Sequence, residues 1–157
     1  MEDEPRSFEN FSKKTFIQKS GVKITIKNLQ NKIKIQPQKI KNLINKVLKD
    51  EKIKKTGYLN ICLVNNSIIK KFNKKFHKTN LATDVLAFDS SNINKNIQAD
   101  IMVSTEMAIR QAKIFKTNAN YELSLYLVHG VLHILGYNDQ NKKQIKIMRQ
   151  TESKYVH

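Results

Sequence analysis

Two histidines stand four residues apart in a strongly apolar segment of the sequence. On a helix, His129 and His133 would lie on one face with Cβ atoms about 6 Å apart, within reach of a single metal ion. Gly136 then allows the chain to turn in the left-handed conformation. Asp139 follows, where its carboxylate can reach the same point. This spacing predicts a metal site with three ligands, His129, His133 and Asp139.

The same offsets occur in the ligand half of the zinc motif H-E-x-x-H-x-x-G-x-x-H. Those proteases carry a glutamate as general base directly after the first histidine, whereas this chain has Gly130 there. Three protein ligands leave one position open on a tetrahedral zinc ion, which is typical of catalytic sites. Two histidines and a carboxylate can also hold Fe(II) or another divalent ion. We therefore expect a catalytic metal, with zinc as the first candidate.

The two histidines could instead be ordinary core residues. Buried imidazoles would each need hydrogen-bond partners, which a leucine-rich helix surface does not offer. The glycine and the carboxylate that follow at suitable offsets are also unexplained by packing. The pattern therefore favours a metal site.

The charge balance points to the class of partner. The 157 residues include 29 Lys and Arg against 13 Asp and Glu, a formal net charge of +16. Cations that bind phosphates release condensed counterions, so nucleic acid is the leading partner. An AT-rich genome could explain the abundant Lys, Asn and Ile, but it would not deplete Asp and Glu. The shortage of acids therefore favours a polyanion partner.

Several classes of protein are disfavoured by composition. One cysteine, Cys62, cannot form a disulfide framework and fits a reducing compartment, so we expect a cytoplasmic protein. The longest strongly apolar stretch, 123–135, is shorter than the roughly 20 residues of a membrane span. The first residues lack a basic region followed by an apolar run, so we expect neither a secretory signal nor a membrane partner.

The elements that must position the ligands follow from the hydrophobic pattern. Short strands are predicted around 22–27, 61–64, 84–88 and 99–103. The segment 121–135 is apolar around nearly its whole circumference, which predicts a central core helix that carries the histidines. This order of elements predicts a single α+β domain in which helices pack on one mixed sheet of about four strands. Residues 1–20 show no period and are expected to be a loosely ordered extension before the domain at 21–157.

Amphipathic helices are expected around this sheet. Pro37 should open one helix. Ser67 should cap a second, with Phe76 on its inward face. Ser104 should cap a third, with Phe115 on its buried stripe. A last helix, with lysines on its outer face, should close the domain.

Three blocks of sequence resemble the YbeY endoribonuclease family of bacterial rRNA maturation factors. The segment from His129 to Tyr137 is similar to the family signature H-G-x-L-H-L-x-G-Y-D-H. Residues 73–88 resemble the family segment N-x-x-[YF]-R…P-T-D-V-L-S-F, and residues 99–104 resemble its strand G-D-I-V-I-S. The blocks agree in order and spacing, and the resemblance covers most of the chain from Val22 onward.

The resemblance implies a single-domain α+β metalloprotein that cleaves single-stranded RNA. It also implies a role in maturing the 3′ end of small-subunit rRNA and in ribosome quality control, with rRNA, the small subunit and its associated proteins as partners. Family members bind zinc through three histidines. Here Asp139 stands at the third position and is expected to substitute as ligand, which bears on affinity and metal preference more than on the site itself.

A second departure lies at His77, where the family has an arginine that contacts RNA phosphate. A neutral imidazole cannot make the bidentate contact of a guanidinium, but it can donate one hydrogen bond. Its lysine neighbours could supply the charge instead, and His77 could equally be an ordinary loop residue. These neighbours are Lys74, Lys75 and Lys78.

Thr83 and Asp84 of the second block could orient a ligand histidine, or could simply cap the start of a strand. The leading hypothesis is a metal-dependent endoribonuclease. The alternative is a non-catalytic, ribosome-associated RNA-binding or assembly factor in which the metal only braces the fold. A metallopeptidase is a third possibility, which Gly130 and the net charge of +16 disfavour.

Overall fold

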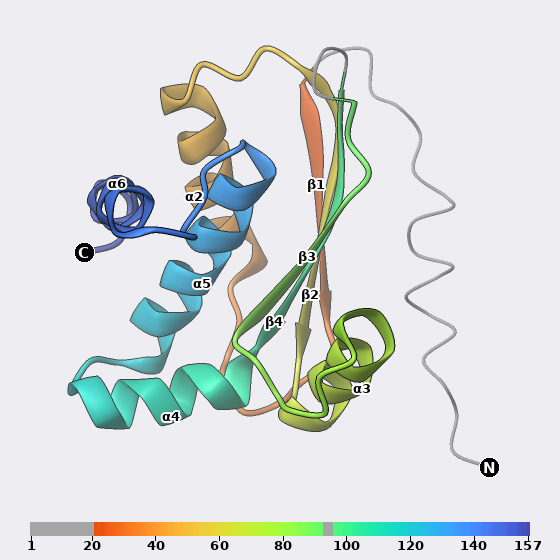
Figure 1. Ribbon diagram of the computed structural model, residues 1–157, viewed down its shortest axis with the longest axis vertical. Helices are drawn as coiled ribbons and strands as arrows, with labels where there is room; N and C mark the ends of the chain where they lie inside the picture. Colours follow the sequence, from red (N-terminus) through yellow and green to blue (C-terminus); the bar gives the residue numbers. More distant parts are fainter. Residues whose placement is uncertain (1–20, 93–95) are drawn as a thin grey trace.

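The computed structural model describes residues 21–92 and 96–157 (Figure 1). Its elements are β1 (Val22–Asn28), α2 (Pro37–Asp50), β2 (Thr56–Val64), α3 (Asn66–His77), β3 (Val85–Asp89), β4 (Asn96–Ser104), α4 (Thr105–Phe115), α5 (Ala119–Ile134) and α6 (Lys142–Glu152). The expected N-terminal extension, residues 1–20, lies outside the described residues, so that prediction stands as made.

The four strands form one mixed sheet in the order β1-β2-β4-β3. β1, β2 and β4 run parallel to one another, and β3 pairs antiparallel with β4 at one edge. Figure 1 shows α2, α4, α5 and α6 on one side of the sheet and α3 on the other. The predicted α+β class and the sheet of four strands are confirmed.

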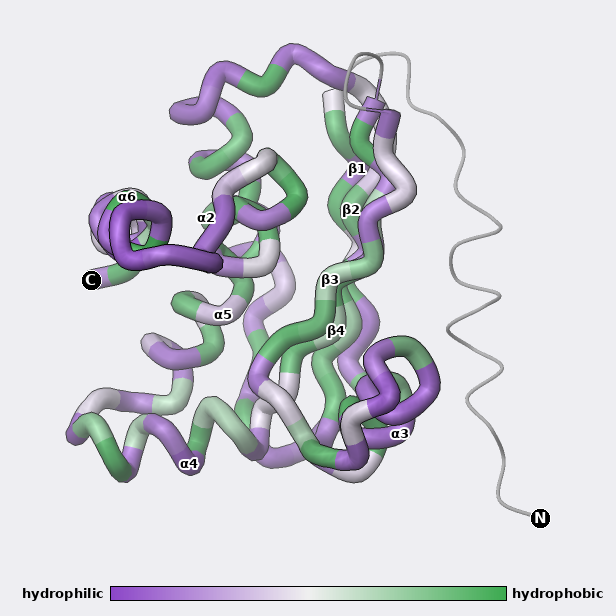
Figure 2. The backbone as a smooth tube through the Cα atoms, in the orientation of Figure 1, coloured by the Kyte–Doolittle hydropathy of each residue, from purple (hydrophilic) through white to green (hydrophobic). Residues whose placement is uncertain are grey.

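The sheet separates two groups of buried side chains. Along β2, Ile61 and Leu63 pack into the larger group, which includes α2 and α5, whereas Cys62 and Val64 pack beside Ile69 of α3. Figure 2 shows hydrophobic residues concentrated in the central strands and in α5, and hydrophilic residues along α6. Cys62 is fully buried as a small core residue, and burial raises the pKa of its thiol to about 11.

The predicted helix starts are right at α2 and α4 and wrong at α3. Pro37 is the first residue of α2, and the Ser104 side chain accepts a hydrogen bond from the first turn of α4. The cap of α3 is Asn65, which accepts hydrogen bonds from the Ile68 amide and from the Ser67 hydroxyl. Asn and Ser are about equally good caps, so propensity alone could not separate two candidates this close together.

Two phenylalanines predicted to point inward are exposed instead. Phe76 is 53% exposed and Phe115 is 65% exposed. Both lie in the last turns of their helices, α3 and α4. Phe76 still contacts two partly buried rings, with centroids 6.1 Å from Phe72 and 5.0 Å from Phe88 of β3.

Helix α5 is the central helix that the sequence predicts. It packs against β3, β4 and the helices α2, α4 and α6, and Leu127, Val131 and Leu132 are fully buried in it. Asn118 caps its start. Gly136, at φ +100°, turns the chain away after its end. Among the described helices, none has the length and apolar character needed to cross a membrane.

Candidate metal centre

The two histidines lie on the last turns of α5, and His129 contacts Glu152 of α6. Their side chains are 25% and 30% exposed, so each is partly accessible to solvent. The Nε2 atoms of His129 and His133 are 3.0 Å apart, and the two rings are inclined at 82°. The helical spacing therefore places both imidazoles at one point, as predicted.

Asp139 completes the group after the turn at Gly136. Its Oδ2 atom lies 3.5 Å from His129 Nε2 and 3.4 Å from His133 Nε2. Within residues 21–92 and 96–157, this is the group of His, Cys, Asp or Glu side chains that could hold a metal ion. The structure thus brings all three predicted ligands together.

The separations within this group suit a small divalent ion. Two donor atoms bound to a tetrahedral ion at about 2.0–2.1 Å are about 3.3 Å apart. The observed separations of 3.0, 3.4 and 3.5 Å bracket that value. The donor set and its spacing therefore fit a zinc-sized ion held by three protein ligands.

Glu152 contacts one of the candidate ligands, and the sequence analysis did not single it out. Its Oε1 atom lies 2.5 Å from His129 Nδ1, and its side chain is only 11% exposed. An ionised carboxylate can only accept hydrogen bonds, so the proton of the neutral His129 ring lies on Nδ1. The lone pair of His129 Nε2 then points toward the other two ligands. The sequence does hold one indication of this contact. Glu152 is the one acid of α6, and it falls four residues after Met148, on the face of the helix that is buried.

The same contact shifts the titration of His129. Burial by itself lowers the pKa of this imidazole. The hydrogen bond and charge of Glu152, with the charges of Asp139 and Asp84, outweigh burial, so the net shift of the pKa is upward. A metal ion must displace a proton from this ring, so acid opposes metal binding at this group.

The group opens into a hollow of about 300 Å³ between α5, α6 and the start of β3. Its walls come from Asp84, Leu125, Tyr126, His129, Asp139, Ile145, Met148, Arg149 and Glu152. The Tyr126 hydroxyl is the one buried side-chain polar atom of the described residues without a hydrogen-bond partner. Two of the three ligands, His129 and Asp139, therefore face a space that another molecule can enter.

Asp84 lies at this pocket, but its hydrogen bonds are local. Its Oδ1 atom accepts from the Val85 amide at 2.8 Å and from the Thr83 hydroxyl at 3.1 Å. These bonds are those of a cap at the start of β3. The charge of Asp84 still contributes to the raised pKa of His129. Its influence on the ligands is thus electrostatic rather than a direct contact.

The residues predicted to contact RNA lie away from the three ligands. His77 is the last residue of α3, across the sheet from α5, and it is exposed (Figure 1). Lys74, Lys75 and Lys78 surround it, and none of the four lines the metal pocket. The structure does not bring them to the ligands, and their contribution to RNA binding stays a prediction.

Position 130 faces the sheet. A Cβ atom built on Gly130 would lie 3.0 Å from Ile101 Cγ2 and 3.2 Å from Val85 Cγ2. A glutamate at this position would be directed into the core rather than at the pocket, so the peptidase base is excluded by packing as well as by sequence.

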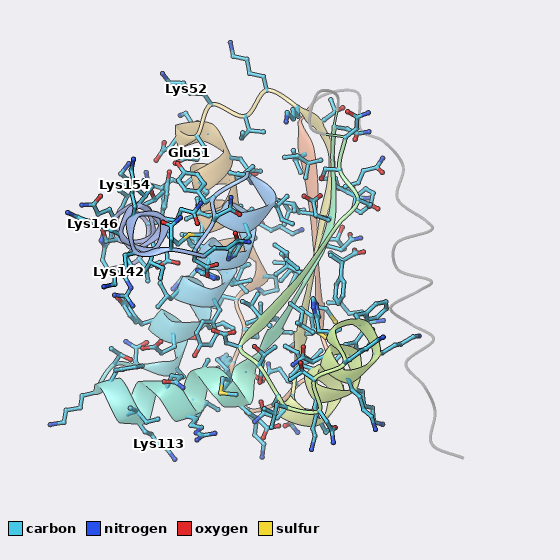
Figure 3. The ribbon with its side chains drawn as sticks, in the orientation of Figure 1. Glu51, Lys52, Lys113, Lys142, Lys146 and Lys154 are labelled. Carbon is cyan, nitrogen blue, oxygen red and sulfur yellow. The ribbon has the colours of Figure 1, made fainter. Side chains whose placement is uncertain are left out.

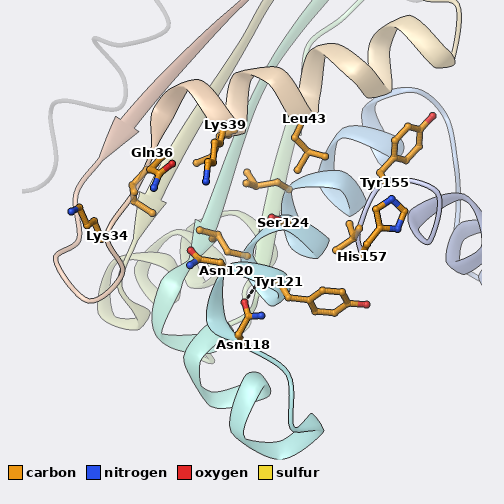
Figure 4. Close-up of a pocket in the computed structure, with 15 residues that line it drawn as sticks. Lys34, Gln36, Lys39, Leu43, Asn118, Asn120, Tyr121, Ser124, Tyr155 and His157 are labelled. Carbon is orange, nitrogen blue, oxygen red and sulfur yellow. Dashed lines mark hydrogen bonds between the residues drawn. The ribbon is translucent and has the colours of Figure 1, made fainter.

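A larger cavity, of about 450 Å³, lies between α2, the start of α5 and the C-terminal residues (Figure 4). Polar side chains on its wall include Lys34, Lys39, Asn118, Ser124 and His157. No Asp, Glu or Cys side chain of the described residues lines it. It therefore lacks a metal-ligand set, and size alone does not mark the functional site.

Replacing Glu152 by alanine is expected to weaken metal binding about 10–100-fold, because the carboxylate fixes the tautomer and orientation of His129. Glu152→Gln keeps an acceptor for Nδ1 and should lose less. Competition with a chromophoric chelator measures both affinities. Glu106→Ala removes an acid that lies outside the pocket and serves as control. Equal affinity in Glu152→Ala and the wild type would contradict this assignment.

Comparison with known proteins identifies relatives of the whole domain. Residues 25–157 match the family model described as Endoribonuclease YbeY. A protein of that name from Syntrophomonas wolfei is 34% identical, over 83% of this chain and 92% of its own length. One from Petrotoga mobilis is 34% identical, over 87% and 94%. The solution structure of TM1509 from Thermotoga maritima superposes with a TM-score of 0.64 at 26% identity, over 87% of each chain.

Proposed function

The chain belongs to the YbeY endoribonuclease family, and from this premise we propose that it cleaves single-stranded RNA at the group formed by His129, His133 and Asp139. Family membership makes it a hydrolase of RNA. The observation that supports the location is the approach of three donor atoms to within 3.0–3.5 Å of one another beside an open pocket. The net charge of +16 supplies the attraction for a polyanion.

The side chains at this site would have different roles. His129, His133 and Asp139 would hold one divalent ion, with zinc as the first candidate. Such an ion supplies Lewis-acid stabilisation of charge on a phosphoryl oxygen and lowers the pKa of water. Glu152 orients His129 through Nδ1, and Asp139 lowers the positive charge of the group by one unit relative to a third histidine. Asp84 adds negative charge at the pocket wall.

We further infer the biological setting from the family. The substrate is rRNA, with the 3′ end of the small-subunit rRNA as the cleavage region, and the small subunit with its associated proteins is the partner. The protein then acts in rRNA maturation and ribosome quality control. Its unpaired, buried Cys62 fits a reducing compartment such as the cytoplasm.

A metal that only braces the fold is less well supported. Structural zinc sites usually have four protein ligands and no open position. The described group has three, and the side chain of Asp139 is 42% exposed. This arrangement favours the endoribonuclease over a non-catalytic assembly factor.

Metal removal tests the proposal. Dialysis against a chelator is expected to abolish cleavage of a fragment that spans the small-subunit rRNA 3′ end, and added zinc should restore it. Gel analysis of end-labelled RNA measures cleavage, and elemental analysis verifies the metal content. Undiminished cleavage by protein shown to be free of metal would contradict the proposed chemistry. Equal cleavage of a scrambled fragment would contradict the rRNA substrate.

A further inference from the structure

Helix α6 has an outer face of cations directly beside the metal pocket. Lys142, Lys146 and Arg149 are separated by four and three residues, so they lie on one side of the helix, and all three are exposed. Figure 3 shows Lys142 and Lys146 at the outer surface of the domain. The one acid of the helix, Glu152, is turned inward onto His129. We call Lys142, Lys146 and Arg149 the basic face of α6.

The basic face is continuous with the metal pocket. Arg149 lines that pocket together with His129 and Asp139. Arg149 also lines a shallow groove on α6, where Lys142 and Lys146 form the remainder of the basic face. From Lys142 to Arg149 the helix rises about 10 Å, roughly the length of three stacked nucleotides. One strand of backbone can therefore lie on the groove and enter the pocket.

The charges of the basic face are not neutralised within the part of the chain that the structure describes. No described carboxylate forms an ion pair with Lys142, Lys146 or Arg149. The acids that line the pocket have other neighbours: Glu152 accepts from His129, Asp84 accepts from the start of β3, and Asp139 lies beside the two histidine Nε2 atoms. A phosphate backbone would provide the missing negative charge, and the Arg149 guanidinium can bind a phosphate with two hydrogen bonds.

We propose that the basic face of α6 binds the RNA backbone as it enters the metal pocket, and that Arg149 contacts the phosphate nearest the ligands. The inference rests on the proposed endoribonuclease function and names the surface that serves it. Arg149 would also make the bidentate phosphate contact that His77 cannot make, because Arg149 lies at the pocket and His77 does not.

Charge removal on α6 tests this surface. The triple variant Lys142→Gln, Lys146→Gln, Arg149→Gln should bind single-stranded RNA at least tenfold more weakly at low salt. The slope of log affinity against log salt should fall by about 2, because each phosphate contact to a single strand contributes about 0.7. Fluorescence anisotropy at 4 °C with a labelled oligonucleotide and the metal-loaded protein measures both quantities before cleavage proceeds. Thermal unfolding checks the fold.

A matched variant removes three charges away from the pocket. Lys52→Gln, Lys113→Gln, Lys116→Gln alters exposed lysines that line neither the pocket nor the groove, and Figure 3 shows Lys52 and Lys113 on other parts of the domain. We expect its affinity to stay within about threefold of the wild type, since long-range charge is screened by salt. Wild-type affinity in the α6 triple variant, or an equal loss in the matched variant, would overturn the proposed surface.

Arg149→Lys separates the phosphate contact from simple attraction. Lysine keeps the charge but loses the planar fork, so we expect RNA affinity and salt slope close to the wild type and cleavage reduced at least tenfold. Wild-type cleavage by Arg149→Lys would overturn the assigned contact. The binding results for the two triple variants do not depend on catalysis. If the wild type binds RNA through α6 but cleaves none, the endoribonuclease proposal fails at this site and the proposed binding surface still holds.

Discussion

His133→Ala is expected to lower the rate of RNA cleavage by at least about 10³-fold while it changes RNA affinity by less than about twofold. His133 provides one of three donor atoms, 3.0 Å from His129 Nε2 and 3.4 Å from Asp139 Oδ2, so its loss opens the metal group. It contributes no charge to the basic face of α6. Single-turnover cleavage and anisotropy on the same preparation measure the two effects.

The control for this variant is another histidine. His157→Ala alters a side chain that lines the separate cavity between α2 and α5 (Figure 4), so wild-type cleavage is expected. His133 is 30% exposed, and thermal unfolding of His133→Ala should remain cooperative, near the wild-type midpoint. Cleavage by His133→Ala at the wild-type rate would refute the metal group as the catalytic site.

The ligands could be predicted because their geometry is local. A spacing of four residues on a helix fixes the approach of His129 and His133, and a glycine turn brings Asp139 back within a few residues. Glu152 could not be predicted in the same way. Its contact with His129 joins residues 23 apart and depends on the packing of α6 against α5. No pattern within either helix specifies that packing.

The fold shows the same division between local and distant information. Alternation of apolar residues located the strands, but the periodic pattern continues through Phe76 and Phe115 beyond the point where the core ends. The resemblance at residues 73–88 predicts an RNA contact at His77. The fold places His77 at the end of α3 and puts Arg149, which no sequence motif marked, at the pocket. Tertiary packing decided which cation lies beside the ligands.

Asp139→Ala is expected to leave the purified protein with most of its metal lost. The carboxylate is the one ligand outside α5, and its Oδ2 lies 3.4–3.5 Å from both Nε2 atoms. Two histidines alone bind a divalent ion much more weakly than three ligands do. Asp139→His restores a third donor of the type that zinc accepts, so this variant should retain metal. Elemental analysis after gel filtration gives the metal content of each protein.

The matched control for Asp139→Ala is Asp50→Ala. The two aspartate side chains are equally exposed, at 42% and 43%, but Asp50 forms an ion pair with Lys46 on α2 and has no part in the pocket. A general effect of removing a surface carboxylate would appear in both variants, whereas loss of a ligand appears only in Asp139→Ala. Because Asp139 is an exposed residue outside the hydrophobic core, metal loss should not be accompanied by unfolding. Stoichiometric metal in purified Asp139→Ala would remove Asp139 from the ligand set and leave His129 and His133 without their third partner.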